Sequence, residues 1–257
     1  MSRMVDFSRM GRAALEAMAV AGSELLECRR VLAKSGDTVL GEVLGGAVPM
    51  AWQHYPPDDI YDPESHAQYF YHAHPPEVRM AGEQGHFHTF LRPRGMPPGT
   101  RPLIMPELAI ADSPAAPAGP AVPQPNQGAG NDELSHLVAI AIDGAGEPYR
   151  LFTTNRWVTG ETWYRAEDVI AMLDRFAIDL ARPSWPLNRW LTALFRLFRP
   201  EMAELLRARD AAVMSWRRRH RGKVHVFEDR RLEIASAVDI DVGEQLARVA
   251  AALKQVA

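Results

Sequence analysis

Four short segments in the middle of the 257-residue chain have the pattern of β-strands, and segments with helical patterns lie before and after them. The strand segments are rich in aromatic and β-branched side chains and are bounded by prolines, glycines or polar turns. They are residues 66–74, 86–91, 136–142 and 149–158. Strands joined in sequence usually pair antiparallel, and helices at both ends then pack on the sheet. The sequence therefore predicts an α+β fold with a central antiparallel sheet flanked by N- and C-terminal helices.

We expect a single domain that spans residues 1–257, a length sufficient to bury a sizeable core. An N-terminal helix is predicted at residues 5–34, where apolar residues alternate with charges at helical spacing. The C-terminal half, residues 165–257, is predicted to be mostly helical. Its predicted elements are helices at 165–180, 186–220 with an interruption at Pro200, and 242–256, with a last strand at 231–240.

A long connection between the second and third predicted strands is rich in proline, glycine and alanine. Residues 93–131 contain ten of the twenty prolines of the chain. Such a composition cannot bury enough apolar surface to order itself. The second half, about residues 107–131, is therefore predicted to be a flexible loop.

Charge and cysteine content exclude several classes of protein. The formal net charge of -3 and the pI near 6.3 give no general attraction to nucleic acid or to an anionic membrane. The single cysteine, Cys28, excludes an internal disulfide and any multi-cysteine metal site. No apolar run reaches 18 residues, and the N-terminus carries charges in place of a signal-peptide core. We expect a cytoplasmic protein that binds a small-molecule substrate and forms a homo-oligomer through its terminal helices.

Histidines are concentrated in one part of the chain, since six of the nine lie between residues 54 and 88. Residues two apart in a strand point to the same face, so His72 and His74 share a face, as do His86 and His88. If the two strands form a hairpin, the two pairs converge. The sequence thus predicts a metal site whose ligands are drawn from these four histidines. His136, which opens an apolar strand, is a further candidate ligand, although a core histidine bonded to a backbone carbonyl is an equal alternative.

The predicted ligands suggest the metal and its chemistry. Imidazole suits zinc, iron, copper and nickel, and the absence of a thiolate cluster favours nitrogen and oxygen ligands. We expect Fe(II) or Zn as the cofactor. Iron with open positions would activate O₂ to oxidise a small molecule, whereas zinc would activate water for hydrolysis. Glu77 and Glu83 lie in the turn between the strands, and Glu83 is predicted to be a ligand or a general base.

The segment from Leu151 to Trp163 is a second candidate for the site. Thr154, Asn155, Arg156 and Trp157 follow a predicted strand and would suit the lining of a cleft. Asn155 and Arg156 are predicted to position the substrate. The alternative is a strand end followed by a helix start. The aromatic residues near the histidines favour an apolar or aromatic substrate.

Three classes of function are consistent with these patterns. The first is a mononuclear metal-dependent oxidoreductase or hydrolase. The second is a non-catalytic metal-binding or ligand-sensing module with every metal position filled by protein. The third is a haem protein, in which one histidine is an axial ligand.

Two families share motifs with the chain. Residues 71–74 followed by residues 85–90 resemble the first cupin motif, a His-x-His with a downstream glutamate. Glu77 follows His74 more closely than in cupins, the second cupin motif is missing, and the helical C-terminal half does not fit a cupin fold.

The chain is more similar, from about His54 to Ile240, to an uncharacterised bacterial family, domain of unknown function 6969. That resemblance is carried by His54-Tyr-Pro-Pro, Tyr71-His-Ala-His-Pro-Pro76, Gly85-His-Phe-His88 and Phe152-Thr-Thr-Asn-Arg-Trp-Val-Thr-Gly-Glu161. It implies one continuous domain and no particular activity.

Overall fold

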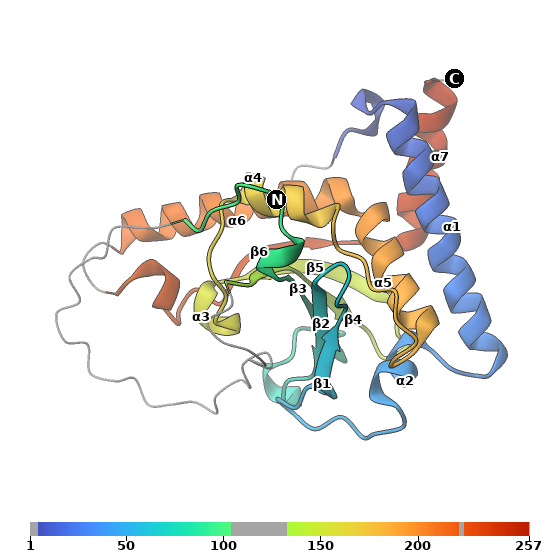
Figure 1. The fold of residues 1–257 in the computed structure, drawn as a ribbon, viewed down its shortest axis with the longest axis horizontal. Coiled ribbons are helices and arrows are strands. Elements are labelled where there is room, and N and C mark those ends of the chain that lie inside the picture. The colour runs from blue at the N-terminus through green and yellow to red at the C-terminus, as the bar shows by residue number, and fades with distance from the viewer. Residues whose placement is uncertain (1–4, 104–132, 221–223, 257) are drawn as a thin grey trace.

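The computed structural model describes residues 5–103, 133–220 and 224–256, which form one six-stranded sheet and seven α-helices (Figure 1). The strands are β1 Tyr55–Tyr61, β2 Ala67–His72, β3 Gly85–Leu91, β4 Ser135–Ile142, β5 Pro148–Thr154 and β6 Ile234–Asp239. The helices are α1 Arg12–Lys34, α2 Val39–Leu44, α3 Arg156–Thr159, α4 Ala166–Leu173, α5 Trp185–Leu197, α6 Arg199–Arg219 and α7 Val242–Gln255. Short 3₁₀ helices occupy η1 Phe7–Arg9, η2 Pro76–Val78, η3 Pro93–Gly95 and η4 Val226–Glu228.

The sheet is an antiparallel meander, with strand order β1-β2-β3-β4-β5-β6. Each strand therefore pairs with its neighbour in sequence. The predicted α+β fold, with an antiparallel sheet and helices at both ends of the chain, is confirmed. That all 257 residues form one domain stays a prediction, and the predicted loop at 107–131 lies outside the described residues.

Strand β1 was not predicted, because Pro56-Pro57-Asp58-Asp59 has the composition of a turn. The backbone is irregular there: the pairing with β2 shifts register between Tyr55 and Ile60, and Asp59 adopts a φ of 53°. At the other end of the sheet, the prediction extended β5 to residue 158. The strand ends at Thr154, because the Asn155 side chain accepts a hydrogen bond from the Arg156 backbone N–H and starts α3.

Helix boundaries differ from the prediction where side chains bond to the backbone. The first helix begins at Arg12 and not at residue 5, since Asp6 caps the separate turn η1. Helix α4 ends at Leu173, seven residues before the predicted end, and the chain beyond it is held by a hydrogen bond from the Ile178 backbone N–H to Thr192 Oγ1, 3.0 Å. The predicted interruption near Pro200 is confirmed, because α5 ends at Leu197 and α6 begins at Arg199.

The two faces of the sheet differ in chemistry. Every residue of β2, β3 and β4 is buried, so both faces are covered. One face carries Tyr69 and Phe87, which pack on α5: the Tyr69 hydroxyl donates to Asn188 Oδ1 at 2.6 Å, and the Phe87 ring lies 6.3 Å from that of Trp190. The main hydrophobic core lies between this face and the helices. The other face carries the histidines.

Helices lie along one side of the sheet and at one end of the molecule. Helix α6 contacts β5 and β6, α4 packs on α6, and α1 packs on both α5 and α7 (Figure 1). Because these helices cover the apolar face, the histidine face is left to be covered by loops and by the short helix α3. None of the described helices combines the length and the apolar composition that a membrane crossing requires.

Candidate metal centre

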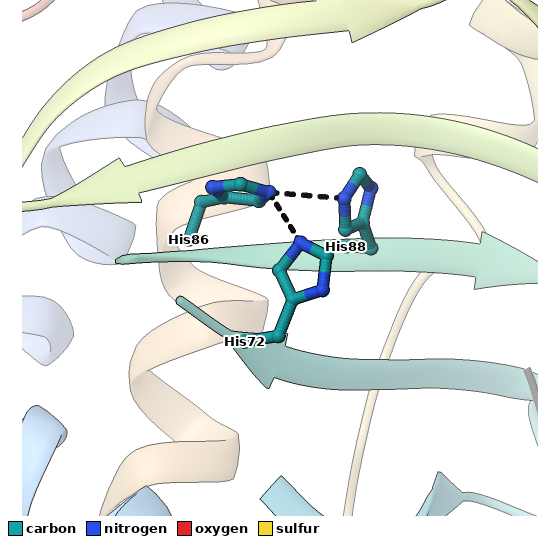
Figure 2. Close-up of side chains that lie close together, drawn as sticks. All are labelled: His72, His86 and His88. Atoms are coloured by element: carbon teal, nitrogen blue, oxygen red, sulfur yellow. Dashed lines mark hydrogen bonds between the residues drawn. The ribbon is translucent and has the colours of Figure 1, made fainter. Parts of the chain in front are cut away.

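Three buried histidines from adjacent strands point their Nε2 atoms at one another (Figure 2). The Nε2 atoms of His72 and His86 lie 2.7 Å apart, and those of His86 and His88 lie 3.1 Å apart. All three ligand atoms fall within 4.8 Å of one another. Such a group could hold a metal ion, and we call it the histidine triad.

Strand register explains the convergence. His72 on β2 is paired directly with His86 on β3, and His88 follows two residues later on the same face. His88 is opposite Phe70, whose ring lies 5.1 Å from the His88 ring and limits its position. The alternation seen in the sequence and the register of the hairpin together bring the three imidazoles close to one another.

Two of the three rings are held from behind through Nδ1. The Glu83 carboxylate accepts a hydrogen bond from His86 Nδ1 and a second one, at 3.1 Å, from the Met80 backbone N–H. His88 Nδ1 lies 3.0 Å from His136 Nε2. Metal-binding histidines usually have such a partner, which fixes the ring and the tautomer. With its Nδ1 donating, each ring presents an unprotonated Nε2 to the centre of the triad.

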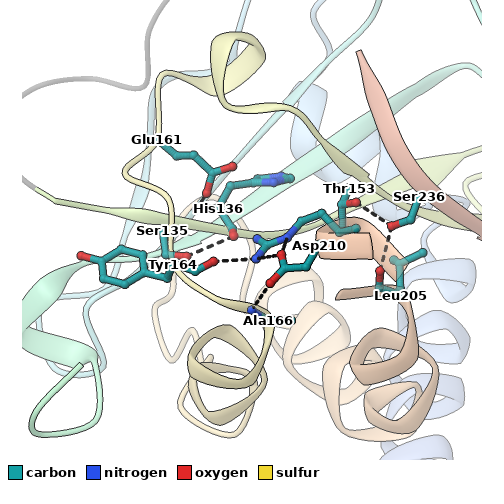
Figure 3. A network of polar contacts seen from close by, with 10 residues as sticks. Ser135, His136, Thr153, Glu161, Tyr164, Ala166, Leu205, Asp210 and Ser236 are labelled. Atoms are coloured by element: carbon teal, nitrogen blue, oxygen red, sulfur yellow. Dashed lines mark hydrogen bonds and ion pairs between the residues drawn. The ribbon is translucent and has the colours of Figure 1, made fainter. Parts of the chain in front are cut away.

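His136 in turn is anchored by a polar network at the start of β4 (Figure 3). Its backbone N–H donates to Glu161 Oε2 at 2.8 Å. Burial raises the pKa of the Glu161 carboxyl to about 8, against the opposing effect of Arg209. Arg209, also buried, donates to the Tyr164 carbonyl at 2.6 Å and ties this network to α6. His136 was predicted as a ligand, and the structure places it behind His88.

Burial favours the neutral form of His72, His88 and His136. It holds the pKa values of His72 and His88 well below the ordinary value, with repulsion from His86 acting in the same direction. Burial also lowers the pKa of His136 to about 3. Burial alone would raise the pKa of Glu83, but its interactions with His86 and the Met80 N–H outweigh this and keep the pKa below its ordinary value. Neutral imidazole is the form that binds a metal ion.

The triad lines a pocket of about 230 Å³. Apolar and aromatic side chains form much of its wall, among them Trp52, Met80, Phe152 and Trp157. The Thr154 hydroxyl is buried in this wall and has no hydrogen-bond partner among the described residues. Thr154 and Trp157, which the sequence placed in a cleft, do line the pocket.

Other predicted site residues lie around the triad or away from it. His74 is half-buried just beyond β2, tilted against Trp52 at 4.4 Å and 5.0 Å from the His86 ring. Glu83 lies behind His86, whereas Glu77 is exposed on η2.

The two residues predicted to position the substrate make structural bonds instead of lining the pocket. Asn155 caps α3 and donates to the Val226 carbonyl at 2.8 Å, and Arg156 pairs with Glu228. Their predicted roles stay untested.

Three residues near the triad were not among the predicted site residues: Trp52, His54 and Glu161. His54 lies outside every predicted strand, yet it is 6% exposed and its ring stacks on that of Phe70. No local pattern marks these residues as part of the site, because their contacts with β2 and β4 form only in the folded sheet.

The donor set fits a mononuclear site. Three neutral imidazole nitrogens match the ligand sets of catalytic zinc and of other borderline metals, which keep one or more positions for water or substrate. A partner on Nδ1 of His86 and of His88 supports the same interpretation.

The comparisons with curated proteins and with solved structures found no match. A family model matches residues 19–240, which is most of the chain and includes the whole sheet. The predicted resemblance to domain of unknown function 6969 is thereby confirmed. The chain belongs to the family described as Domain of unknown function (DUF6969).

Proposed function

We propose that this protein is a mononuclear metal-dependent enzyme that acts on a small molecule, with Zn or Fe(II) held by His72, His86 and His88. The observation that carries the proposal is the convergence of three buried Nε2 atoms at the wall of a pocket. A site with three protein ligands leaves room for water or substrate on the metal, as catalytic sites require. A bound metal would supply Lewis acidity to a substrate in that pocket, and iron would add redox chemistry.

The pocket wall supports an apolar or planar substrate. Trp52 and Trp157 offer flat surfaces, and the Trp157 ring is fixed because its Nε1 donates to the Leu232 carbonyl at 2.9 Å. Trp52 adopts a φ of 69°, a strained conformation for a bulky residue, and such strain tends to persist at binding sites. The Thr154 hydroxyl, which has no partner among the described residues, is available to orient a bound molecule, and Arg230 and Glu233 also line the pocket.

Metal content tests the proposal. Protein purified without oxygen is analysed for iron and zinc, as wild type, as His86→Asn and as the control His220→Asn. His220 follows α6 and packs on Trp216, outside the triad. We expect about one equivalent of metal in the wild type and the control, and a loss in His86→Asn. A wild type without metal after reconstitution, or a His86→Asn variant that keeps it, overturns the proposal.

A non-catalytic metal site is the second candidate, and the position of His74 favours it. The His74 ring lies 5.1 Å from that of His72 and 5.0 Å from that of His86, and no hydrogen bond holds it among the described residues. If the ring turned away from Trp52 to become a fourth ligand, the metal would be closed to substrate.

Cobalt separates the two candidates. Azide added to the Co²⁺-loaded protein changes the visible absorption spectrum if a coordination position is open to the pocket. We expect that change in the wild type and in His74→Ala. A spectrum that azide changes only in His74→Ala would show that His74 closes the site.

A further inference from the structure

One ring of the triad lacks the support that the other two have. His72 Nδ1 is buried and has no hydrogen-bond partner among the described residues, whereas His86 Nδ1 has Glu83 and His88 Nδ1 has His136. An unsatisfied buried donor is costly, so the state in which His72 works should supply a partner.

His54 is the neighbour that can fill this role. Its ring centroid lies 6.0 Å from that of His72, with the two planes at 71°, and its own Nε2 is buried without a partner among the described residues. Its ring stacks on Phe70 at 3.6 Å, so its position is fixed.

The tautomer of His54 matches what His72 needs. His54 Nδ1 lies 2.9 Å from Asp59 Oδ1, and the other oxygen of Asp59 accepts a hydrogen bond from Gln68 Nε2 at 2.9 Å. A carboxylate that only accepts places a proton on His54 Nδ1, and in the tautomer with its one proton there Nε2 is an acceptor. His72 with Nε2 toward a metal must carry its proton on Nδ1. The two atoms without partners among the described residues, His72 Nδ1 and His54 Nε2, are thus a donor and an acceptor.

The rings of His54 and His72 lie only slightly farther apart than those of a hydrogen-bonded pair of histidines. Within this protein, His88 and His136 show the spacing of a hydrogen-bonded pair: their centroids are 5.0 Å apart when Nδ1 and Nε2 are 3.0 Å apart. The centroids of His54 and His72 are 1.0 Å farther apart than that.

A bound metal would reduce this gap. Tetrahedral ligands with metal–nitrogen bonds of about 2.0–2.1 Å are about 3.3 Å apart, more than the 2.7 Å between His72 and His86 Nε2. Because β2 lies between β1 and β3, a His72 ring that moves away from His86 moves toward the β1 side, where His54 lies.

We propose that His54, held by Asp59, is the positioning residue for His72, and that metal binding closes a hydrogen bond from His72 Nδ1 to His54 Nε2. The triad would then have three supports of the same kind, from Glu83, His136 and His54. This proposal rests on the proposed metal site, which it deepens.

The test compares zinc affinities, measured by competition with a chromophoric chelator. His54→Phe keeps an aromatic ring on Phe70 and removes the acceptor, and His220→Phe is a matched histidine-to-phenylalanine control that packs on Trp216. We expect His54→Phe to bind zinc about 10–100-fold more weakly than wild type, the usual effect of removing such a partner. The control should bind as the wild type does. The visible spectrum of Co²⁺-loaded His54→Phe should also change, which a merely structural role would not produce.

Asp59→Asn is the second variant, since an amide can donate to His54 Nδ1 and reverse its tautomer. We expect a similar loss of zinc affinity in Asp59→Asn. The double variant, His54→Phe with Asp59→Asn, should lose no more than either single variant, because both changes remove the same hydrogen bond. Wild-type affinity and an unchanged cobalt spectrum in both single variants would overturn this proposal alone. A wild type that binds no metal would overturn the proposed function and this inference together.

Discussion

Acid should destabilise the metal-free protein through His136. This side chain is 2% exposed, and burial, aided by repulsion from Arg209, lowers its pKa to about 3. In an unfolded chain the histidine pKa is about 6.5. Between these two pH values the unfolded state binds a proton that the native state does not bind. The free energy of unfolding therefore falls as the pH drops below about 6.5 and continues to fall until about pH 3.

The size of the effect follows from proton linkage. One proton of difference changes the free energy of unfolding by about 1.4 kcal/mol per pH unit. From pH 6.5 to pH 5 the contribution of His136 is therefore about 2 kcal/mol. A loss of this size is a substantial part of the roughly 5–15 kcal/mol that stabilises most proteins.

The assay is urea unfolding at pH 7.5, 6 and 5 in the presence of a chelator, for wild type and His136→Gln. Glutamine keeps an acceptor for His88 Nδ1 but does not titrate. The other buried histidines contribute to both proteins, so the difference between the two slopes isolates His136. We expect the wild type to lose about 2 kcal/mol more than the variant between pH 7.5 and pH 5. Equal losses would refute a neutral, buried His136.

Three further predictions concern the two faces of the sheet. Glu83→Gln should weaken zinc binding about tenfold or more in a chelator competition assay, because the charge behind His86 is lost while an acceptor remains; unchanged affinity would contradict this. Gly85→Ala should reduce both the zinc affinity and the free energy of unfolding, because a Cβ there would lie 2.5 Å from the His72 carbonyl oxygen. We expect a loss of about 1–3 kcal/mol in urea unfolding. Wild-type values would show that β2 and β3 can separate freely. Phe87→Ala on the helix-facing side should cost about 3–5 kcal/mol in the same assay yet keep one zinc per folded chain, and a loss of zinc would mean that the faces are not independent.

The central part of the site could be predicted because it depends on two local rules. Alternation within a strand put His86 and His88 on one face, and the short connection from β2 to β3 made a hairpin the simplest pairing. The observed register, which pairs His72 with His86, then brings the two faces together. His136, a further candidate ligand, lies on the same face as His88, since it is paired with Phe90 across a shift in register.

The roles of the surrounding residues could not be predicted, because they depend on contacts between strands that the sequence does not show. His54 is held by Asp59 only because the irregular backbone of β1 turns that carboxylate inward. Glu161 comes 25 residues after His136, and a shared hydrogen bond was not apparent from their positions. The pattern around Asn155 and Arg156 suited a cleft and a helix start equally well: Asn155 starts α3, while Thr154 and Trp157 on either side of the pair line the pocket.

The chemistry of the histidine face is difficult to explain by folding alone. The opposite face shows that this chain can fill a sheet surface with Tyr69, Phe87 and aliphatic residues packed on helices. On the histidine face the protein buries five imidazoles, those of His54, His72, His86, His88 and His136, and leaves nitrogens of two of them without partners among the described residues. Each unsatisfied buried polar atom costs about 1–3 kcal/mol. An apolar replacement would avoid that cost, so a sequence that retains these imidazoles gains something other than stability of the metal-free state. A cation at the point where the Nε2 atoms converge would engage three lone pairs at once, and its binding energy would add to the stability of the folded chain.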